Sequence, residues 1–472
     1  MSASGQPIVN SNQRDALAEA LLGKRVLLHS IFHPRTVAVI GASGQPETLG
    51  HKTFSSLMSS PFGGNLFAVN SKETAVLGVQ AYPSISAVQK RVDLAVVATP
   101  AETVPGIIDE CAQAGVKGAI VLSAGFSERG REGAALEQQI QEKLNGSRMR
   151  LMGPSSLGVI NPLTGLNATP GLHVPLGGTI AFLSQSGSLA TAILDWSFQR
   201  IVGFSAFLSV GTMLNVGWGD LIDYFGSDPQ TRSILIYMES INDVRSFLSA
   251  AREVSRDKPI IVIKAGRTDD AVRAVPWHTA HVAGDDAVLE AAFRRVGVLS
   301  VESIDELFFM ADVLSKQPLP KGPRLMVVSN AGASSVLAAD GVISTGGELA
   351  QLSSEGRAEF DKLRPVVESD NPIDVLGDGS PETYAKAIEI SAKDPNCDGL
   401  LLLTLPTTFS DPRKATDLPA GAKQPCGKTD FGLFHGRGDS RSSRKSYPRL
   451  HSDTAFAACR GPSLPSHVAV QL

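Results

Sequence analysis

The feature that most constrains the fold is an alternation of short apolar, β-branched runs with amphipathic helical stretches between about residues 36 and 405. Residues 102–115 (ETVPGIIDECAQAG) are one of the helical stretches. The first strand-like runs are residues 36–43, 65–70, 94–100, 118–125 and 150–154. This alternation is typical of a parallel sheet with helices on both faces, so the sequence predicts an α/β fold.

The pattern then restarts, which indicates more than one sheet. The second set of apolar runs covers residues 179–187, 204–211, 233–240 and 259–266. A Pro- and Gly-containing linker at 314–323 precedes a third set, 324–332 and 399–406. A chain of 472 residues is also too long for one core. We therefore expect an N-terminal tail with a short helix at 1–27 and three α/β domains at 28–168, 169–316 and 322–408, the last incomplete.

Residues 409–472 differ in character from the rest. They are rich in Arg, Ser, Pro, Gly and His and show neither strand nor helix periodicity. Because such a composition buries too little apolar surface to offset its ordering entropy, we predict an irregular, disordered tail. A reading-frame shift in the gene would give the same pattern. We interpret the Arg437-Gly438-Asp439 tripeptide as a chance occurrence in this composition rather than an integrin motif.

Composition argues against several classes of function. A formal charge of −4 does not favour a nucleic-acid or membrane-surface partner. No run approaches the roughly 18 apolar residues of a membrane helix, and the N-terminus does not resemble a secretory signal. The four cysteines have neither metal-ligand spacing nor the pattern of a disulfide framework. We expect a cytoplasmic protein with no metal site of its own.

The glycine turn after the first strand is a candidate anion site. Gly41, Ala42 and Ser43 lie between a strand and a helix, where backbone N–H groups can approach a phosphate. The second strand ends Val69-Asn70-Ser71-Lys72, without the carboxylate that an NAD ribose requires, whereas Lys72 suits a phosphate. The turn therefore favours a phosphorylated ligand other than NAD; the alternative is an ordinary Rossmann turn with a solvated lysine.

Two further loops are expected at the same sheet edge, where open α/β sheets bind ligands. They are Ala98-Thr99-Pro100 and Ser123-Ala124-Gly125. Each is compatible with an ordinary turn, but small-residue loops on one rim favour a shared pocket.

The second predicted domain carries a possible phosphoryl-transfer site. Ser186, Gly187 and Ser188 join a strand to a helix, whose N-terminus attracts phosphate; a simple serine cap is the alternative. His278 can accept a phosphoryl group if its other ring nitrogen is oriented, and Glu239 at a strand end is a candidate partner. A lone loop histidine is more often a surface residue.

Taken together, these segments resemble the ADP-forming acyl-CoA synthetases, relatives of the succinyl-CoA synthetase α-subunit. The resemblance covers about residues 28–410 and includes GPSSLGVINP, SQSGSLATAILDW and NPIDVLGD. It implies a Rossmann-like CoA-binding domain followed by two flavodoxin-like domains of the succinyl-CoA synthetase type. His278 matches the family's phosphorylated histidine, although the loop reads W-H-T-A here in place of S-H-T-G.

The resemblance also implies roles for the candidate residues. Gly41, Ala42, Ser43 and Lys72 would lie near the phosphates of CoA or acetyl-CoA, and the loops at 98–100 and 123–125 would line the same ligand. Ser186, Gly187 and Ser188 would cradle phosphate, and Glu239 would support His278. ADP, ATP and Mg²⁺ would bind through an ATP-grasp partner in an oligomer.

Three alternatives remain at this stage. The chain could be the CoA-binding regulatory part of a GNAT-type lysine acetyltransferase, or an inactive CoA-binding remnant. An NAD-dependent oxidoreductase is disfavoured by the first glycine turn.

Overall fold

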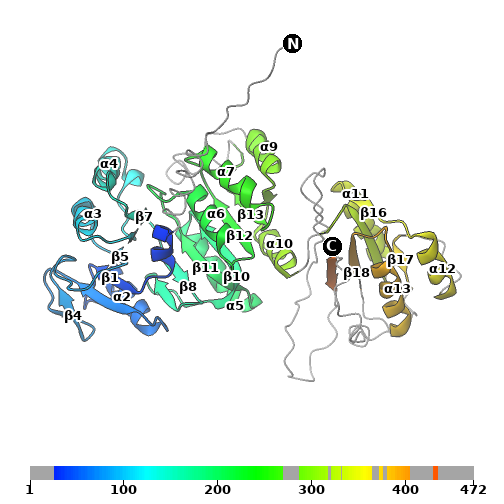
Figure 1. Cartoon of the computed structure of the whole chain (residues 1–472), viewed down its shortest axis with the longest axis horizontal. Coiled ribbons are helices and arrows are strands. Elements are labelled where there is room, and N and C mark those ends of the chain that lie inside the picture. The colour runs from blue at the N-terminus through cyan, green and yellow to red at the C-terminus, as the bar shows by residue number, and fades with distance from the viewer. Residues whose placement is uncertain are drawn as a thin grey trace, which may run out of the picture. The chain divides into compact units, whose positions relative to one another are not determined.

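The computed structural model describes residues 26–268, 286–316, 320–330, 332–363, 371–375, 380–403 and 429–433. The chain divides into two compact units, Met1–Ser300 and Val301–Leu472 (Figure 1). Two seven-stranded sheets lie in the first unit, and a smaller sheet lies in the second. The predicted α/β class is confirmed.

The first sheet has the strand order β3-β4-β2-β1-β5-β6-β7. Its strands are β1 (Thr36–Ile40), β2 (Asn65–Val69), β3 (Ala75–Val76), β4 (Val79–Tyr82), β5 (Leu94–Val97), β6 (Gly118–Val121) and β7 (Arg150–Met152). All neighbouring strands are parallel except the β3–β4 hairpin. Since the chain runs from β1 to β2 on one side and later to β5 on the other, the topological switch lies beside β1.

Helices cover both faces of this sheet. They are residues 26–32, α2 (Leu49–Ser59), α3 (Val104–Gln113) and α4 (Arg131–Leu144), with 3₁₀ turns η1 (Ala101–Thr103) and η2 (Ser127–Arg129). Every residue of β1, β5 and β6 is buried, which explains their uninterrupted apolar sequence. The faces alternate: Val37 and Val39 pack with Phe54 of α2, whereas Ala38 and Ile40 pack with α3 and α4.

The second sheet has the order β14-β13-β12-β10-β11-β8-β9. Its strands are β8 (Gly158–Asn161), β9 (Leu166–Ala168), β10 (Leu176–Ser184), β11 (Gly203–Ser209), β12 (Ser233–Met238), β13 (Ile260–Lys264) and β14 (Leu299–Val301). Its helices are α5 (Gly187–Arg200), α6 (Trp218–Ser227), α7 (Val244–Val254) and α9 (Asp286–Val296). Residues 158–168, which we expected in the first domain, thus contribute two strands here, with β8 antiparallel to β11.

One apolar core joins the two sheets of the first unit. It includes Phe32 before β1, Phe54 of α2 and Phe225 of α6, all at most 2% exposed. The rings of Phe32 and Phe225 lie 5.0 Å apart. At the same seam, Arg150 of β7 donates to Asp220 of α6 at 2.7 Å. The first unit is therefore held together by continuous packing rather than by a linker.

The second unit contains the third sheet. Its strands are β15 (Arg324–Ser329), β16 (Glu348–Leu349), β17 (Ile373–Asp374), β18 (Gly399–Leu403) and β19 (Thr429–Leu433). Its helices are α10 (Ile304–Lys316), α11 (Gly332–Ser344), α12 (Ser354–Leu363) and α13 (Pro381–Lys393). Alternate residues of β15 pack into two separate apolar clusters. One contains residues of α12 and α13 and the other residues of α11, so these helices lie on opposite faces of the sheet.

The third sheet corrects one prediction about the tail. Thr429–Leu433, in the region predicted to be irregular, is a strand parallel to β18. Its sequence TDFGL is short and contains Asp and Gly, so strand propensity alone does not identify it; backbone pairing with the buried β18 does. The rest of 409–472 lies outside the described residues.

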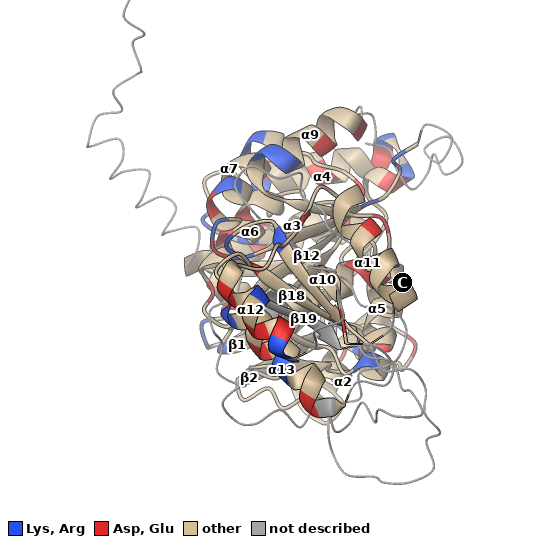
Figure 2. Ribbon diagram, turned by 90° about the vertical axis from the view of Figure 1, so that its right-hand side faces the viewer, with Lys and Arg blue, Asp and Glu red and all other residues tan. Residues whose placement is uncertain are grey.

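Basic and acidic positions are interspersed along the helices of the ribbon in Figure 2. On α13, Glu389 pairs with Lys386 at 2.9 Å and with Lys393 at 2.7 Å, a pattern typical of a solvated helix face. Among the helices that the structure describes, none combines the length and apolar character needed to cross a membrane.

Candidate functional site

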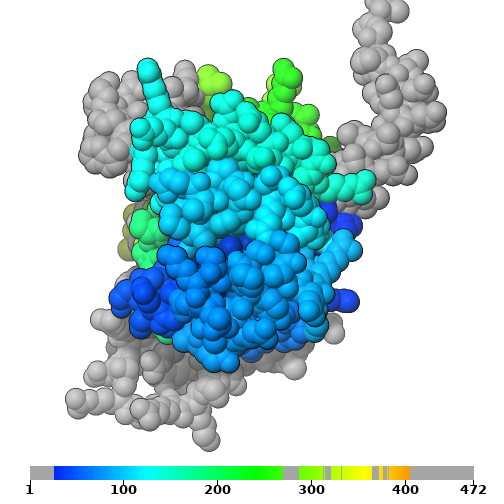
Figure 3. Space-filling model, turned by 90° about the vertical axis from the view of Figure 1, so that its left-hand side faces the viewer, coloured from blue at the N-terminus to red at the C-terminus, as the bar shows by residue number. Residues whose placement is uncertain are grey.

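The predicted ligand loops of the first sheet meet at one edge. The strands β2, β1, β5 and β6 are neighbours in the sheet and parallel, so their carboxyl ends lie side by side. The residues that follow these ends are the predicted ones: Gly41, Ala42 and Ser43 after β1, Lys72 after β2, Ala98, Thr99 and Pro100 after β5, and Ser123, Ala124 and Gly125 after β6. Residues of this sheet and its helices, blue to cyan in Figure 3, form the face turned to the viewer there.

The turn between β1 and α2 is so compact that it requires glycine at two positions. Gly41 has φ +92°, and a Cβ at this position would lie 2.7 Å from the Ala98 carbonyl oxygen. A Cβ on Gly50, in the first turn of α2, would lie 1.8 Å from the Gly41 carbonyl oxygen. The helix N-terminus therefore packs directly on the turn, with Thr48 as its cap.

Two residues that the sequence analysis did not single out organise this turn. Asn70 donates through Nδ2 to the Ala42 carbonyl at 2.7 Å and accepts from the N–H groups of Lys72 and Glu73. Glu73 accepts from Ser43 Oγ at 3.1 Å and from the Gly44 N–H at 2.9 Å. An Asn at a strand end and a carboxylate four residues after β2 were the only signals for them.

The loops after β5 and β6 are tied to each other. Ser123 Oγ donates to the Thr99 carbonyl, and the Gly125 N–H donates to Glu128 at 2.6 Å. Burial opposes ionisation of Glu128, but hydrogen bonds led by the Gly125 N–H outweigh it and lower the pKa of this carboxyl. An ionised Glu128 thus fixes the loop after β6.

A loop after β7 connects this rim to the second sheet. Ser155 donates its N–H to the Ser123 carbonyl at 2.9 Å, and the Thr212 N–H donates to the Pro154 carbonyl at 3.0 Å. A Cβ on Gly187 would lie 3.5 Å from Leu157 Cβ, which is ordinary contact. Residues 153–158 therefore lie between the loops of the first sheet and the N-terminus of α5.

The predicted phosphate loop is the N-terminus of α5. Ser186 is its N-cap, and Ser186 Oγ accepts from the Leu189 N–H at 3.3 Å and lies 3.2 Å from Ser188 Oγ. Ser186 is buried, whereas Ser188 is exposed. Ser186 therefore caps α5, and the helix N-terminus remains suited to an anion.

Gln185 joins this loop to Glu239. Its Oε1 accepts from the N–H groups of Glu239 at 2.6 Å and Ser240 at 2.8 Å, and its Nε2 donates to Ser240 Oγ at 2.9 Å. Trp218 Nε1 donates to the Ser240 carbonyl at 2.9 Å. Both groups predicted at this site, the serine loop and Glu239, are therefore held together by one amide that the sequence analysis missed.

Partly buried ionisable groups surround Glu239. Burial, followed by the nearby charge of Glu239, raises the pKa of Tyr237 to about 12. Burial also lowers the pKa of Lys264, at the end of the neighbouring β13, while Asp286 and Glu239 oppose that shift. Shifted pKa values in neighbouring groups at a sheet edge are typical of functional sites. His278 lies outside the described residues.

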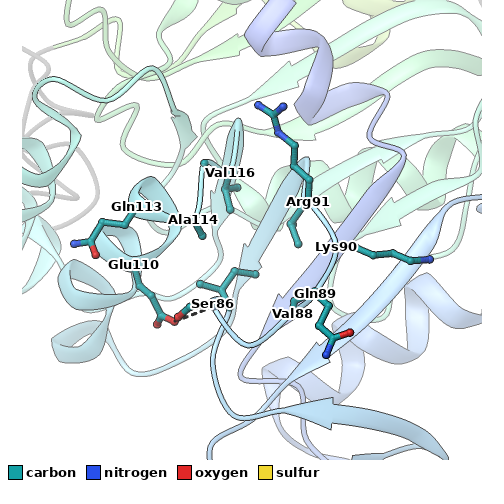
Figure 4. A pocket seen from close by; sticks show the side chains of 12 residues that line it. Ser86, Val88, Gln89, Lys90, Arg91, Glu110, Gln113, Ala114 and Val116 are labelled. Atoms are coloured by element: carbon teal, nitrogen blue, oxygen red, sulfur yellow. Dashed lines mark hydrogen bonds between the residues drawn. The ribbon is translucent and has the colours of Figure 1, made fainter.

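A pocket of the described chain lies away from these residues (Figure 4). It has a volume of about 540 Å³ and is lined by Ile85, Ser86, residues 88–92, and the end of α3 with the residues that follow it, to Val116. Residues 92 and 116 precede β5 and β6, so the pocket lies at the amino edge of the sheet, opposite the predicted ligand loops. Its Glu110 carboxylate accepts from Ser86, and no predicted site residue lines it.

Cysteine and metal chemistry find no support in the described ranges. Cys111 and Cys397 are free and buried, and burial raises the pKa of the Cys111 thiol to about 12, which keeps it protonated. Within those ranges no group of three or more His, Cys, Asp or Glu side chains could hold a metal ion.

Comparison with protein families gives three matches along the chain. Residues 35–162 match a CoA binding domain, residues 177–314 a succinyl-CoA ligase like flavodoxin domain, and residues 325–422 a ligase-CoA domain. The matches follow the order of the three sheets.

Curated relatives match over most of the chain. Acetate–CoA ligase [ADP-forming] I of Archaeoglobus fulgidus is 38% identical over 84% of this chain and 58% of that protein. Acetate–CoA ligase [ADP-forming] II subunit alpha of Pyrococcus furiosus is 37% identical over 81% of this chain and 84% of that subunit. The chain thus spans little more than half of the first relative and most of the second.

A solved structure has a similar fold. Acetyl-coenzyme A synthetase 1 of Ca. Korarchaeum cryptofilum, in complex with phosphate and ADP, superposes with a TM-score of 0.80 at 34% identity. The match covers 87% of this chain and 89% of that one.

Proposed function

This chain belongs to the family of ADP-forming acetate–CoA ligases, and from that premise we propose that it is the α-type chain of such an enzyme. It would interconvert an acyl-CoA, phosphate and ADP with a carboxylate, CoA and ATP through a phosphohistidine. The relatives are ligases and subunits of ligases, which favours this function over the acetyltransferase, remnant and oxidoreductase alternatives.

One observation carries the proposal. The four loops at the carboxyl edge of the first sheet are connected through residues 153–158 to the N-terminus of α5. A ligand with phosphates on the first sheet would thus have its acyl thioester directed toward the N-terminus of α5 in the second.

The residues of the first sheet fit the phosphates of CoA. The turn offers the Ser43 hydroxyl and the Gly44 N–H as donors, and the absence of a Cβ at Gly41 permits close approach of the backbone. Lys72 is exposed beside this turn, so its ammonium group can pair with a phosphate. Ala98–Pro100 and Ser123–Gly125 would line the rest of the ligand.

The residues of the second sheet fit inorganic phosphate and its transfer. Ser186, Gly187 and Ser188 would bind phosphate at the N-terminus of α5, where the helix dipole stabilises negative charge. Glu239 would accept from one ring nitrogen of His278 and so orient the other toward the phosphoryl group. An ATP-grasp β-type subunit would supply ADP and Mg²⁺, in keeping with the α-subunit relatives.

The test is labelling of the full-length chain with acetyl-CoA and radioactive inorganic phosphate. We expect an acid-labile, base-stable label on the wild type and none on His278→Ala, with CoA affinity unchanged by that substitution. Titration calorimetry with CoA should show binding that Lys72→Ala weakens about tenfold, because a charge-assisted hydrogen bond is lost. Label that persists on His278→Ala, or a folded chain that binds no CoA, would exclude the proposed function.

A further inference from the structure

The donors of the β1–α2 turn are already occupied by a carboxylate of the chain itself. Glu73 accepts from Ser43 Oγ at 3.1 Å, from the Gly44 N–H at 2.9 Å and from Asn70 Nδ2 at 3.3 Å. The first two are the donors that the proposed function assigns to the phosphates of the ligand. An internal anion thus holds the position where that function requires an external one.

The local backbone aims Glu73 at the turn. Asn70 Oδ1 accepts from the N–H groups of Lys72 at 2.7 Å and Glu73 at 3.0 Å, which folds the end of β2 back toward β1. A Cβ on Gly44 would lie 2.9 Å from Glu73 Oε2, so the carboxylate lies directly against the turn. Glu73 is only partly buried, and a small rotation of its side chain would free the donors.

We propose that Glu73 is an internal competitor for the phosphates of the ligand. While the Gly44 N–H and the Ser43 hydroxyl donate to the Glu73 carboxylate, they are not available to a phosphate. Two negative charges in the same turn also repel each other. Glu73 therefore leaves the turn when a phosphate enters, and its departure lowers the affinity for phosphorylated ligands. The inference rests on the proposed CoA site and states how that site selects among ligands.

The competition acts only on the part of the ligand that carries phosphate. Pantetheine has the thiol arm of CoA but no phosphate, so its affinity should not depend on Glu73. A change confined to CoA would distinguish competition at the turn from a general change in the charge or shape of the domain.

Titration calorimetry of CoA and pantetheine into the full-length chain tests the inference. We expect Glu73→Gln to bind CoA about tenfold more tightly than the wild type and pantetheine equally well. Glu47→Gln is the matched control: it removes the same charge from the same turn, but the Glu47 side chain is 91% exposed and pairs with Lys52 at 3.0 Å. Its CoA affinity should stay within twofold of the wild type.

Other outcomes overturn the inference. CoA binding that Glu73→Gln weakens or leaves unchanged would mean that the carboxylate supports the turn or contacts the ligand. Equal tightening of pantetheine would point to a general effect. If Lys72→Ala weakens CoA binding while Glu73→Gln leaves it unchanged, the proposed function stands and the competition is excluded. If no folded variant binds CoA, the proposed function itself is excluded.

A second variant covers the case in which Glu73→Gln folds poorly. The carboxylate of Glu73→Asp is one methylene further from the donors, so this substitution should shift CoA affinity in the same direction.

Discussion

Two glycines near the amino ends of helices show how strongly the local surroundings decide the role of one residue. A Cβ on Gly50 of α2 would lie 1.8 Å from the Gly41 carbonyl oxygen, whereas a Cβ on Gly106 of α3 would meet no atom within 4 Å. Neither has the positive φ that favours glycine. Gly50 is therefore required by the close approach of α2 to the β1–α2 turn, and Gly106 is not required.

Alanine substitutions at these positions should have opposite effects. Gly50→Ala forces the β1–α2 turn apart, and we expect it to lower the free energy of unfolding by about 2 kcal/mol and to weaken CoA binding. Gly106→Ala restricts the unfolded chain without a clash and should raise the free energy of unfolding by about 0.5–1 kcal/mol. Chemical denaturation followed by circular dichroism measures both. Equal effects of the two substitutions would contradict the packing seen here.

At the scale of elements, the loop between β10 and α5 couples the two halves of the second candidate site. Gln185 satisfies the N–H groups of Glu239 and Ser240 and the Ser240 hydroxyl with one side chain. Removing the amide leaves these groups to water and loosens the end of β12. Gln185 is thus a positioning residue for the proposed site.

Gln185→Ala should separate the proposed chemistry from ligand binding. We expect the rate of phosphate labelling to fall at least tenfold, because Glu239 is no longer fixed against the serine loop, while CoA affinity stays within twofold. Gln138→Ala, which removes an amide of α4 that donates to Glu142 at 3.2 Å, is the control and should leave both unchanged. A labelling rate equal to that of the wild type would show that Gln185 only stabilises the fold.

The elements that the sequence could predict are those with a strong periodic signal. The central strands β1, β5 and β6 are buried on both faces and read as continuous apolar runs. The strands β3, β4, β8 and β9 are each only two to four residues long. Such strands are too short to show an alternation of apolar and polar residues in the sequence.

The candidate site was predictable only where residue type carries its chemistry. Glycine turns and a serine cap pointed to the candidate loops, since few other residues fit such positions. Glu73 was missed because an acidic residue at such a site is expected directly at the end of the second strand. Glu73 lies four residues after the end of β2 and folds back toward the turn. Gln185 was missed because a neutral amide has no motif; only the fold shows that it bridges two strand ends.

At the scale of the first unit, a polar cluster crosses the seam between the two sheets. The ring of His33 stacks on His29 with centroids 4.4 Å apart, and both rings lie 3.2 Å from the Tyr224 hydroxyl of α6. The other ring nitrogen of His33 lies 3.4 Å from Asn161 Nδ2, which donates to the Phe32 carbonyl at 3.1 Å. Because Asn161 Nδ2 is a donor, this contact suits a neutral His33 that accepts there.

The cluster predicts that acid weakens the seam. Burial, followed by the charge of His29, lowers the pKa of His33 below its ordinary value of 6.5, and Asp228 only partly opposes this. As the pH falls below 6.5 the unfolded chain binds the proton first, so the stabilisation by neutral His33 is complete above that pH and is lost as the pH falls through the folded-state pKa. We expect the melting temperature of the first unit to decrease from pH 7 to pH 5 and His33→Gln to flatten that dependence. A substitution of the exposed His173 by Gln should leave it unchanged. If His33→Gln retains the full dependence, the acid sensitivity arises elsewhere, and the seam depends on its apolar core and on the Arg150–Asp220 ion pair rather than on His33.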